Sequence, residues 1–325
     1  MLLAYVAFPG RENRQRLAKC GATVGQKAFI SEIDKPMKIY RSPDDGHRYR
    51  PSIFRQIESF GGELHHEERG LAHPHALASV PWAGFEGALS RAVTDFEALR
   101  VTGGEPGSDA FRRALESYAA LLAQGVAFSD TIWKPVAECF LPVGEEPKIP
   151  HVAKDRRHIA MICNKPKHNQ NFLTPVTGTA DDGRKVLGFS VYEITPKGVQ
   201  ISNREIHSEA EAFSLALEIK RAVTTVFVIG ERMADFISSI AVPNSIPAAS
   251  LSGGDIARVE LLRRVCELPS DRFPFERGDV PGIEFSGTEV TIRSSGGFAR
   301  RLPGQIRMTV SATPQLGALS IKVPL

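Results

Sequence analysis

Apolar residues recur every three or four positions through two consecutive stretches of the chain, which is the pattern of amphipathic helices. The two apolar stripes consist of Phe85, Leu89, Val93 and Phe96, then Phe111, Leu115, Tyr118 and Leu122. Between them, Gly103, Gly104 and Gly107 interrupt the pattern, and Ser108 can cap the second helix by accepting a backbone hydrogen bond. We therefore predict two helices joined by a glycine-rich turn.

From residue 159 to residue 206 the pattern changes to short apolar segments separated by turn residues. Asp181-Asp182-Gly183 is typical of a tight turn between two strands, and Pro196 and Gly198 suit a type I turn before the next one. The apolar segment Ile159 to Cys163 predicts a further short strand before them. We therefore predict an antiparallel meander over residues 159–206.

After residue 206 the pattern returns to helices and then to strands. Ser208 and Glu211 have the spacing of a capping box, which predicts the start of a helix. Residues 223–229 suit either a buried strand or a buried helix, and continuity with both flanks favours the helix. Another helix is predicted from Ser252 onward. Short strands are predicted at residues 2–8, 283–285, 289–293, 305–312 and 319–323.

Together these elements predict an α+β protein: a mixed N-terminal portion with helices, an antiparallel β-meander, a helical middle and a C-terminal β-hairpin unit. The proline-bounded segment PVGEEPKIP, residues 142–150, is typical of a linker. We therefore divide the chain into a mixed α/β N-terminal region, residues 1–147, and an α+β C-terminal region, residues 148–325. The 325 residues and the apolar fraction of 42% suit a folded chain of one or two domains.

Apolar content, cysteine spacing and charge exclude several classes of protein. The sequence has no run of about 18 apolar residues, so we expect no membrane-spanning helix. The four cysteines lie far apart with no CxxC pair, which suits core residues of a protein in a reducing cytoplasm. The net charge of +3 is too small to indicate nucleic-acid binding, so only a local group of cations can support that function. The composition gives the impression of a bacterial protein.

Two local groups of basic residues are candidates for binding phosphates, each with an aromatic ring that can stack on a base. The first flanks the apolar segment at 159–163 and consists of Lys154, Arg156, Arg157, Lys165, Lys167 and His168, with Phe172 as its ring. The second lies beside Gly296-Gly297 and consists of Arg300, Arg301 and Arg307, with Phe298 as its ring. The alternative is that both groups are solvated surface, where lysine and arginine discourage pairing of strand edges.

Histidines and carboxylates cluster between residues 65 and 75, and zinc, iron and manganese accept such ligands. The candidate ligands are His65, His66, Glu67, His73 and His75. Their spacing does not match H-E-x-x-H on one face of a helix, and a solvated polar loop is the alternative interpretation. A divalent metal is the one cofactor that the sequence suggests.

No Walker, G-x-G-x-x-G or G-x-S-x-G motif is present, so nothing in the sequence specifies a reaction. Glu218-Ile219-Lys220 matches the E-x-K fragment of restriction-type nucleases, but the capping pattern places it on a helix, where that motif does not belong. Our leading hypothesis is a non-enzymatic nucleic-acid-binding subunit of a larger assembly, in which the two basic groups converge. The alternatives are a metal-dependent hydrolase or nuclease that uses the histidine cluster, and a scaffold that binds another protein through an apolar helix face.

Overall fold

The chain forms an α+β fold, as the sequence predicts, in a computed structural model. The structure describes residues 37–41, 49–168, 172–194, 200–207, 212–241, 244, 253–276, 278–301, 306–311 and 318–323. From Pro36 onward the chain forms one compact unit. The strand predicted at residues 2–8 lies outside the described residues. The predicted boundary at 147/148 lies between two helices and stays a prediction.

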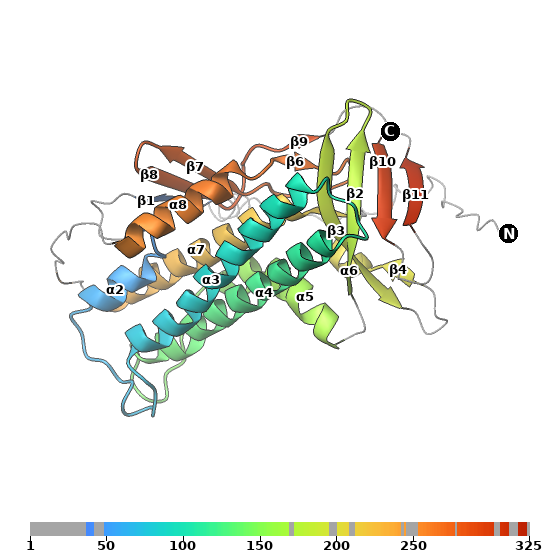
Figure 1. Ribbon diagram of the computed structural model, residues 1–325. Coiled ribbons are helices and arrows are strands. Elements are labelled where there is room, and N and C mark those ends of the chain that lie inside the picture. The colour runs from blue at the N-terminus through green and yellow to red at the C-terminus, as the bar shows by residue number, and fades with distance from the viewer. Residues whose placement is uncertain are drawn as a thin grey trace, which may run out of the picture. The chain divides into compact units, whose positions relative to one another are not determined.

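Long helices make up most of the core (Figure 1). In chain order the helices are α2 (Ile53–Ser59), α3 (Pro74–Val101), α4 (Asp109–Thr131), a π-helical turn η2 (Ile132–Val136), α5 (Val152–His168), α6 (Arg204–His207), α7 (Leu215–Ile240) and α8 (Gly253–Glu267). The predicted pair of helices is confirmed as α3 and α4. The Ser108 hydroxyl accepts a hydrogen bond from the Phe111 backbone N–H at 3.2 Å, and Gly103 and Gly104 turn the chain at positive φ of 84° and 69°.

Aromatic side chains fill the centre of the helical layer around Trp82 on α3. The ring of Trp82 lies 5.5 Å from that of Phe128 on α4, 5.8 Å from Phe54 on α2 and 6.0 Å from Phe227 on α7, measured between centroids. Each of these four side chains is at least 95% buried. Because one indole joins three helices from distant parts of the sequence, its packing determines how those helices meet.

Helix α7 resolves the ambiguous segment at residues 223–229 in favour of a helix. It is buried along most of its length because α2, α4 and α5 pack on it and strands of both larger sheets contact it. The helix begins at Leu215 rather than near residue 208, and Ser208 and Glu211 lie outside the described residues. Among the described residues, none of the helices combines the length and apolar character that crossing a membrane requires.

The strands of the described residues form three sheets. In chain order they are β1 (Lys38–Arg41), β2 (Phe172–Ala180), β3 (Lys185–Ile194), β4 (Gln200–Ser202), β5 (Phe213–Ser214), β6 (Asp271–Arg272), β7 (Gly282–Ser286), β8 (Glu289–Arg293), β9 (Arg300–Arg301), β10 (Ile306–Ser311) and β11 (Ala318–Val323). The largest sheet has the order β11-β10-β2-β3-β4, and β5 also pairs with β3. A second sheet has the order β1-β8-β7, and β6 pairs with β9 in parallel.

The predicted meander is confirmed for β2, β3 and β4, which pair antiparallel. The C-terminal hairpin is also confirmed, as β10 and β11. However, β10 also pairs with β2, so this hairpin extends the meander sheet instead of forming a separate unit. The large sheet lies across one end of the long helices in Figure 1.

The strand predicted at Ile159 to Cys163 is wrong, because this segment is the middle of helix α5. A run of five apolar residues fits either a buried strand or a buried helix, and here packing against α4 and α7 decides between them. Val152 lies seven residues before Ile159, which is two helical turns, and both side chains are fully buried. The basic residues around this segment therefore lie on one helix instead of at two ends of a strand.

Candidate functional site

Helix α5 carries the first basic group and is held against the molecule by an apolar face. Val152, Ile159 and Ile162 are buried, and the helix packs on α4 and α7. The side chain of Ile159 packs beside Gly125 of α4. The opposite side of α5 therefore faces the solvent.

Ion pairs near the start of α5 occupy its half-buried charged side chains. The Arg156 guanidinium lies 2.7 Å from the Asp130 carboxylate and rests over the ring of Trp133 at 5.9 Å. Asp155 pairs with Arg232 of α7. The single carboxylate of this helix is therefore engaged with α7.

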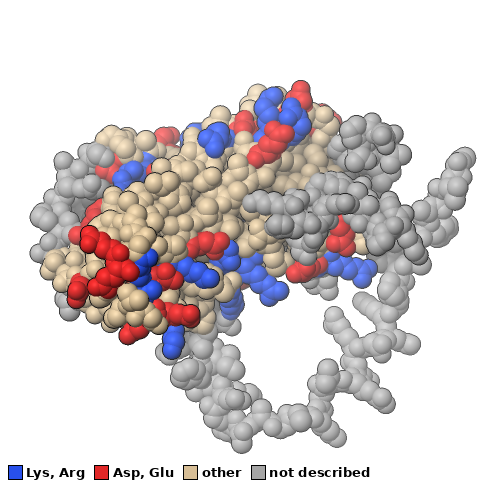
Figure 2. Space-filling model, turned by 90° about the horizontal axis from the view of Figure 1, so that it is seen from below, with Lys and Arg blue, Asp and Glu red and all other residues tan. Residues whose placement is uncertain are grey.

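The solvent side of α5 is basic. Lys154, Arg157 and Asn164 are exposed, and the 3.6-residue period places positions 165 and 168 on the same face as these three. We call Lys154, Arg157, Asn164 and positions 165 and 168 the α5 basic face. Lys and Arg side chains gather in the middle of the molecule's lower side, and acidic side chains gather toward one end (Figure 2). The side chains of Lys165, Lys167, His168 and Phe172 lie outside the described residues.

The second basic group does not join the α5 basic face. Strand β9, which holds Arg300 and Arg301, lies along the upper edge of Figure 1, and α5 lies along the lower edge. Arg300 donates two hydrogen bonds to Asp271, at 2.7 and 3.2 Å, whereas Arg301 and Phe298 are exposed. The side chain of Arg307 lies outside the described residues. The two groups that the sequence hypothesis combined therefore belong to different surfaces.

The histidine cluster is divided among three small groups. His66 and His73 contact each other with ring centroids 5.3 Å apart, and His73 Nδ1 caps α3 by accepting the His75 backbone N–H at 3.2 Å. His75 Nε2 lies 3.7 Å from the carboxylate of Glu58, and Glu67 is exposed. His65 instead faces Glu68, with its Nδ1 3.2 Å from a carboxylate oxygen.

A different set of potential metal ligands forms around His65. One ligand atom from each of Glu63, His65 and Glu68 lies within 4.8 Å of the others. Glu63 lies just before the predicted histidine cluster at residues 65–75. Its approach to Glu68 depends on the fold of the loop. Two carboxylates and one imidazole are a donor set that zinc accepts, and three protein ligands leave one coordination position open.

A buried polar network lies behind α5, and the sequence did not reveal it. Glu218 of α7 is fully buried and accepts hydrogen bonds from His158 Nε2 at 2.8 Å, Arg221 Nε at 2.9 Å and the Tyr118 hydroxyl at 3.1 Å. Burial alone would raise the pKa of Glu218, but the charge interactions and hydrogen bonds with His158 and Arg221 outweigh this effect and lower it to about 2. The network ties α4, α5 and α7 together.

His207 and Glu276 extend this polar interior. His207 Nε2 accepts the Val191 backbone N–H at 2.7 Å, and burial lowers the pKa of His207 to about 4. Glu276 accepts the backbone N–H groups of Ser214 and Phe273, but burial and the charge of Glu218 raise the pKa of Glu276 to about 8. Within α7, Glu218 and Arg221 lie three residues apart, which is the spacing of neighbouring side chains on a helix.

Comparison with known proteins adds no family to this description, since no family model, curated protein or solved structure matches the chain.

Proposed function

We propose that the chain is a non-enzymatic nucleic-acid-binding protein that contacts the phosphate backbone with the α5 basic face. The observation that carries this proposal is the arrangement of α5, whose exposed cations Lys154 and Arg157 lie on one side while its carboxylate is paired on another. Positions 154 to 168 span about 21 Å of helix, which corresponds to roughly six base pairs along one strand of B-form DNA.

The salt dependence of binding tests the proposal. With about three phosphate contacts, the logarithm of the association constant for duplex DNA should fall with the logarithm of salt concentration at a slope of about −3. Replacing both Lys154 and Arg157 by glutamine should reduce the steepness of this slope by about 2 and weaken binding to all sequences alike. Fluorescence anisotropy with labelled duplex DNA, single-stranded DNA and RNA measures both quantities.

A charge-matched control distinguishes the contribution of the α5 basic face to binding from that of the overall charge. The double variant Arg263→Gln and Arg301→Gln removes the same charge from exposed side chains on α8 and β9, both in the upper half of Figure 1, and should leave the slope unchanged. Equal weakening by the two double variants would contradict the assignment to α5. Absence of binding to every probe at low salt would remove the function itself.

A second candidate function is a metal-dependent hydrolase or nuclease that holds its ion with Glu63, His65 and Glu68. The proximity of these three ligand atoms favours it. Zinc bonds of about 2.1 Å in a tetrahedral site place ligand atoms about 3.4 Å apart, so small side-chain rotations bring this set to the required spacing. The open fourth position would accept the water that a hydrolase activates.

Zinc titration by calorimetry tests the second candidate. His65→Ala should weaken zinc binding by at least about tenfold, whereas His75→Ala, a change of the same kind just outside the set, should have little effect. Zinc-dependent cleavage of a phosphodiester substrate such as bis(p-nitrophenyl) phosphate should be lost in parallel. Retention of zinc affinity in the His65→Ala variant would exclude this site.

A further inference from the structure

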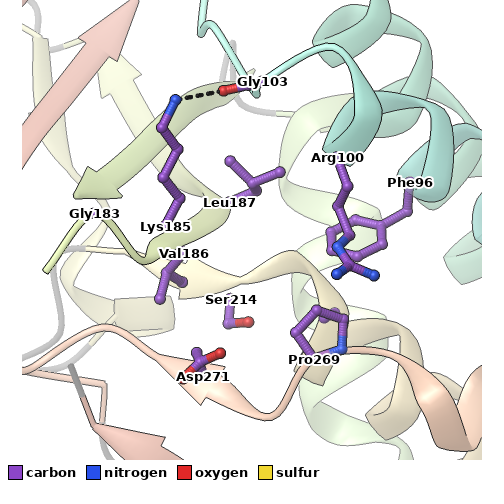
Figure 3. A pocket seen from close by; sticks show the side chains of 11 residues that line it. Phe96, Arg100, Gly103, Gly183, Lys185, Val186, Leu187, Ser214, Pro269 and Asp271 are labelled. Atoms are coloured by element: carbon purple, nitrogen blue, oxygen red, sulfur yellow. Dashed lines mark hydrogen bonds between the residues drawn. The ribbon is translucent and has the colours of Figure 1, made fainter. Parts of the chain in front are cut away.

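A pocket of about 230 Å³ is lined by residues that belong neither to α5 nor to the histidine loop. Its walls come from the end of α3, the β2–β3 hairpin, β5 and β6 (Figure 3). Segments from four distant parts of the sequence therefore enclose one space, and neither the proposed function nor the second candidate uses it.

The side chain of Arg100 extends from the last turn of α3 into this space, toward Pro269 (Figure 3). Within the described part of the chain, no ion pair or hydrogen bond involves its guanidinium. The other cation in the wall, Lys185, turns away and donates to the Gly103 carbonyl at 2.7 Å. Arg100 is thus the cation that remains available to a bound molecule.

The carboxylate of the pocket is already neutralised. Asp271 accepts the bidentate pair from Arg300, and the Arg184 guanidinium lies 3.7 Å from it on the hairpin side. The side chain of Ser214 lies between Asp271 and Arg100 (Figure 3). A ligand entering this space meets one unpaired positive charge beside a serine, and a carboxylate whose charge is balanced.

The rest of the wall is apolar. Phe96, Val186 and Leu187 line the space and are themselves almost fully buried, so they form a fixed surface. The volume is below the range of about 300–1,000 Å³ that is typical of sites for drug-sized ligands. A ligand of about ten non-hydrogen atoms, with a charged end and an apolar end, matches this size and this division of polarity.

We propose that this pocket binds a small organic anion, whose carboxylate or phosphate pairs with the Arg100 guanidinium and whose apolar group packs against Phe96, Val186 and Leu187. The planar guanidinium forms two parallel hydrogen bonds with either anionic group. This site is separate from the α5 basic face. The proposal therefore does not depend on whether the protein binds nucleic acid.

Ligand-observed NMR and calorimetry with three probes of similar shape test the proposal. Benzoate and phenyl phosphate carry the two candidate anionic groups, and benzamide is the neutral match for benzoate. We expect at least one anion to bind at millimolar concentrations and benzamide to bind at least about tenfold more weakly. The preferred anion identifies the chemical group that the site takes.

Substitutions on α3 test whether the anion binds beside Arg100 in this pocket. Arg100→Gln should weaken binding of the preferred anion by at least about tenfold. Arg91→Gln removes the same charge from an exposed position of the same helix and should leave that affinity unchanged. Thermal melting of both variants verifies that they fold. Binding of benzamide as tight as that of the anions, no binding of either anion, or unchanged affinity in Arg100→Gln would each overturn the proposal.

Discussion

Replacing Glu218 by alanine is expected to lower the free energy of unfolding by about 3–5 kcal/mol, because it removes one partner from a buried charged network. Arg221 and the Tyr118 hydroxyl would then lose their shared acceptor, and His158 would lose the group that anchors α5. Buried polar groups without partners retain the full cost of leaving water. Urea unfolding followed by circular dichroism measures the change.

Glu116 supplies the matched control for this prediction. It is an exposed glutamate on α4 whose carboxylate lies 2.9 Å from Arg112, one helical turn away. Because an exposed ion pair contributes little, Glu116→Ala should change the free energy of unfolding by at most about 0.5 kcal/mol. A loss below about 1 kcal/mol in Glu218→Ala would show that water or rearrangement compensates for the missing carboxylate.

Acidification should destabilise the fold through His207, by about 3 kcal/mol in total. Its pKa falls from 6.5 to about 4 on folding, so the unfolded chain binds more protons between these values. This contribution to stability is complete above pH 6.5 and is lost as the pH falls toward 4. The physical cause is that burial disfavours the charged form of the ring. Protonation would also remove the acceptor of the Val191 N–H.

Titration of Glu276 changes the free energy of unfolding in the opposite direction. The pH dependence of wild-type stability alone therefore does not isolate the contribution of His207. The pKa of Glu276 rises from 4.5 to about 8 on folding, and stability through this group therefore increases as the pH falls through that range. The difference between the wild-type protein and His207→Gln, measured by urea unfolding from pH 7 to pH 4, cancels this effect. Parallel stability curves for the two proteins would contradict the role of His207.

The features that the sequence predicted well depend on neighbouring residues. Ser108 lies three residues before the N–H that it caps, and the Asp181-Asp182-Gly183 turn joins strands on either side of it. Such signals need no knowledge of the rest of the fold. The α+β class follows from them because helical and strand segments occupy separate stretches of the chain.

The features that the sequence did not predict depend on distant contacts. The apolar run at 159–163 carries no local signal that separates helix from strand, and packing against α4 and α7 decides it. The network around Glu218 joins residues 60 and 100 positions apart, so no spacing rule could reveal it. The two basic groups likewise resemble each other in composition, and only the topology shows that they face different ways.

The pairing of β1 with β8 has a consequence for how the protein is made. β1 leaves the ribosome before the long helices of the described chain, yet its hydrogen-bonding partner at residues 289–293 is translated only after them. The nascent chain therefore carries an unpaired strand edge while the residues between β1 and β8 are synthesised, and one edge of β2 stays unpaired until β10 is made. We expect co-translational chaperones to engage this chain before β8 emerges.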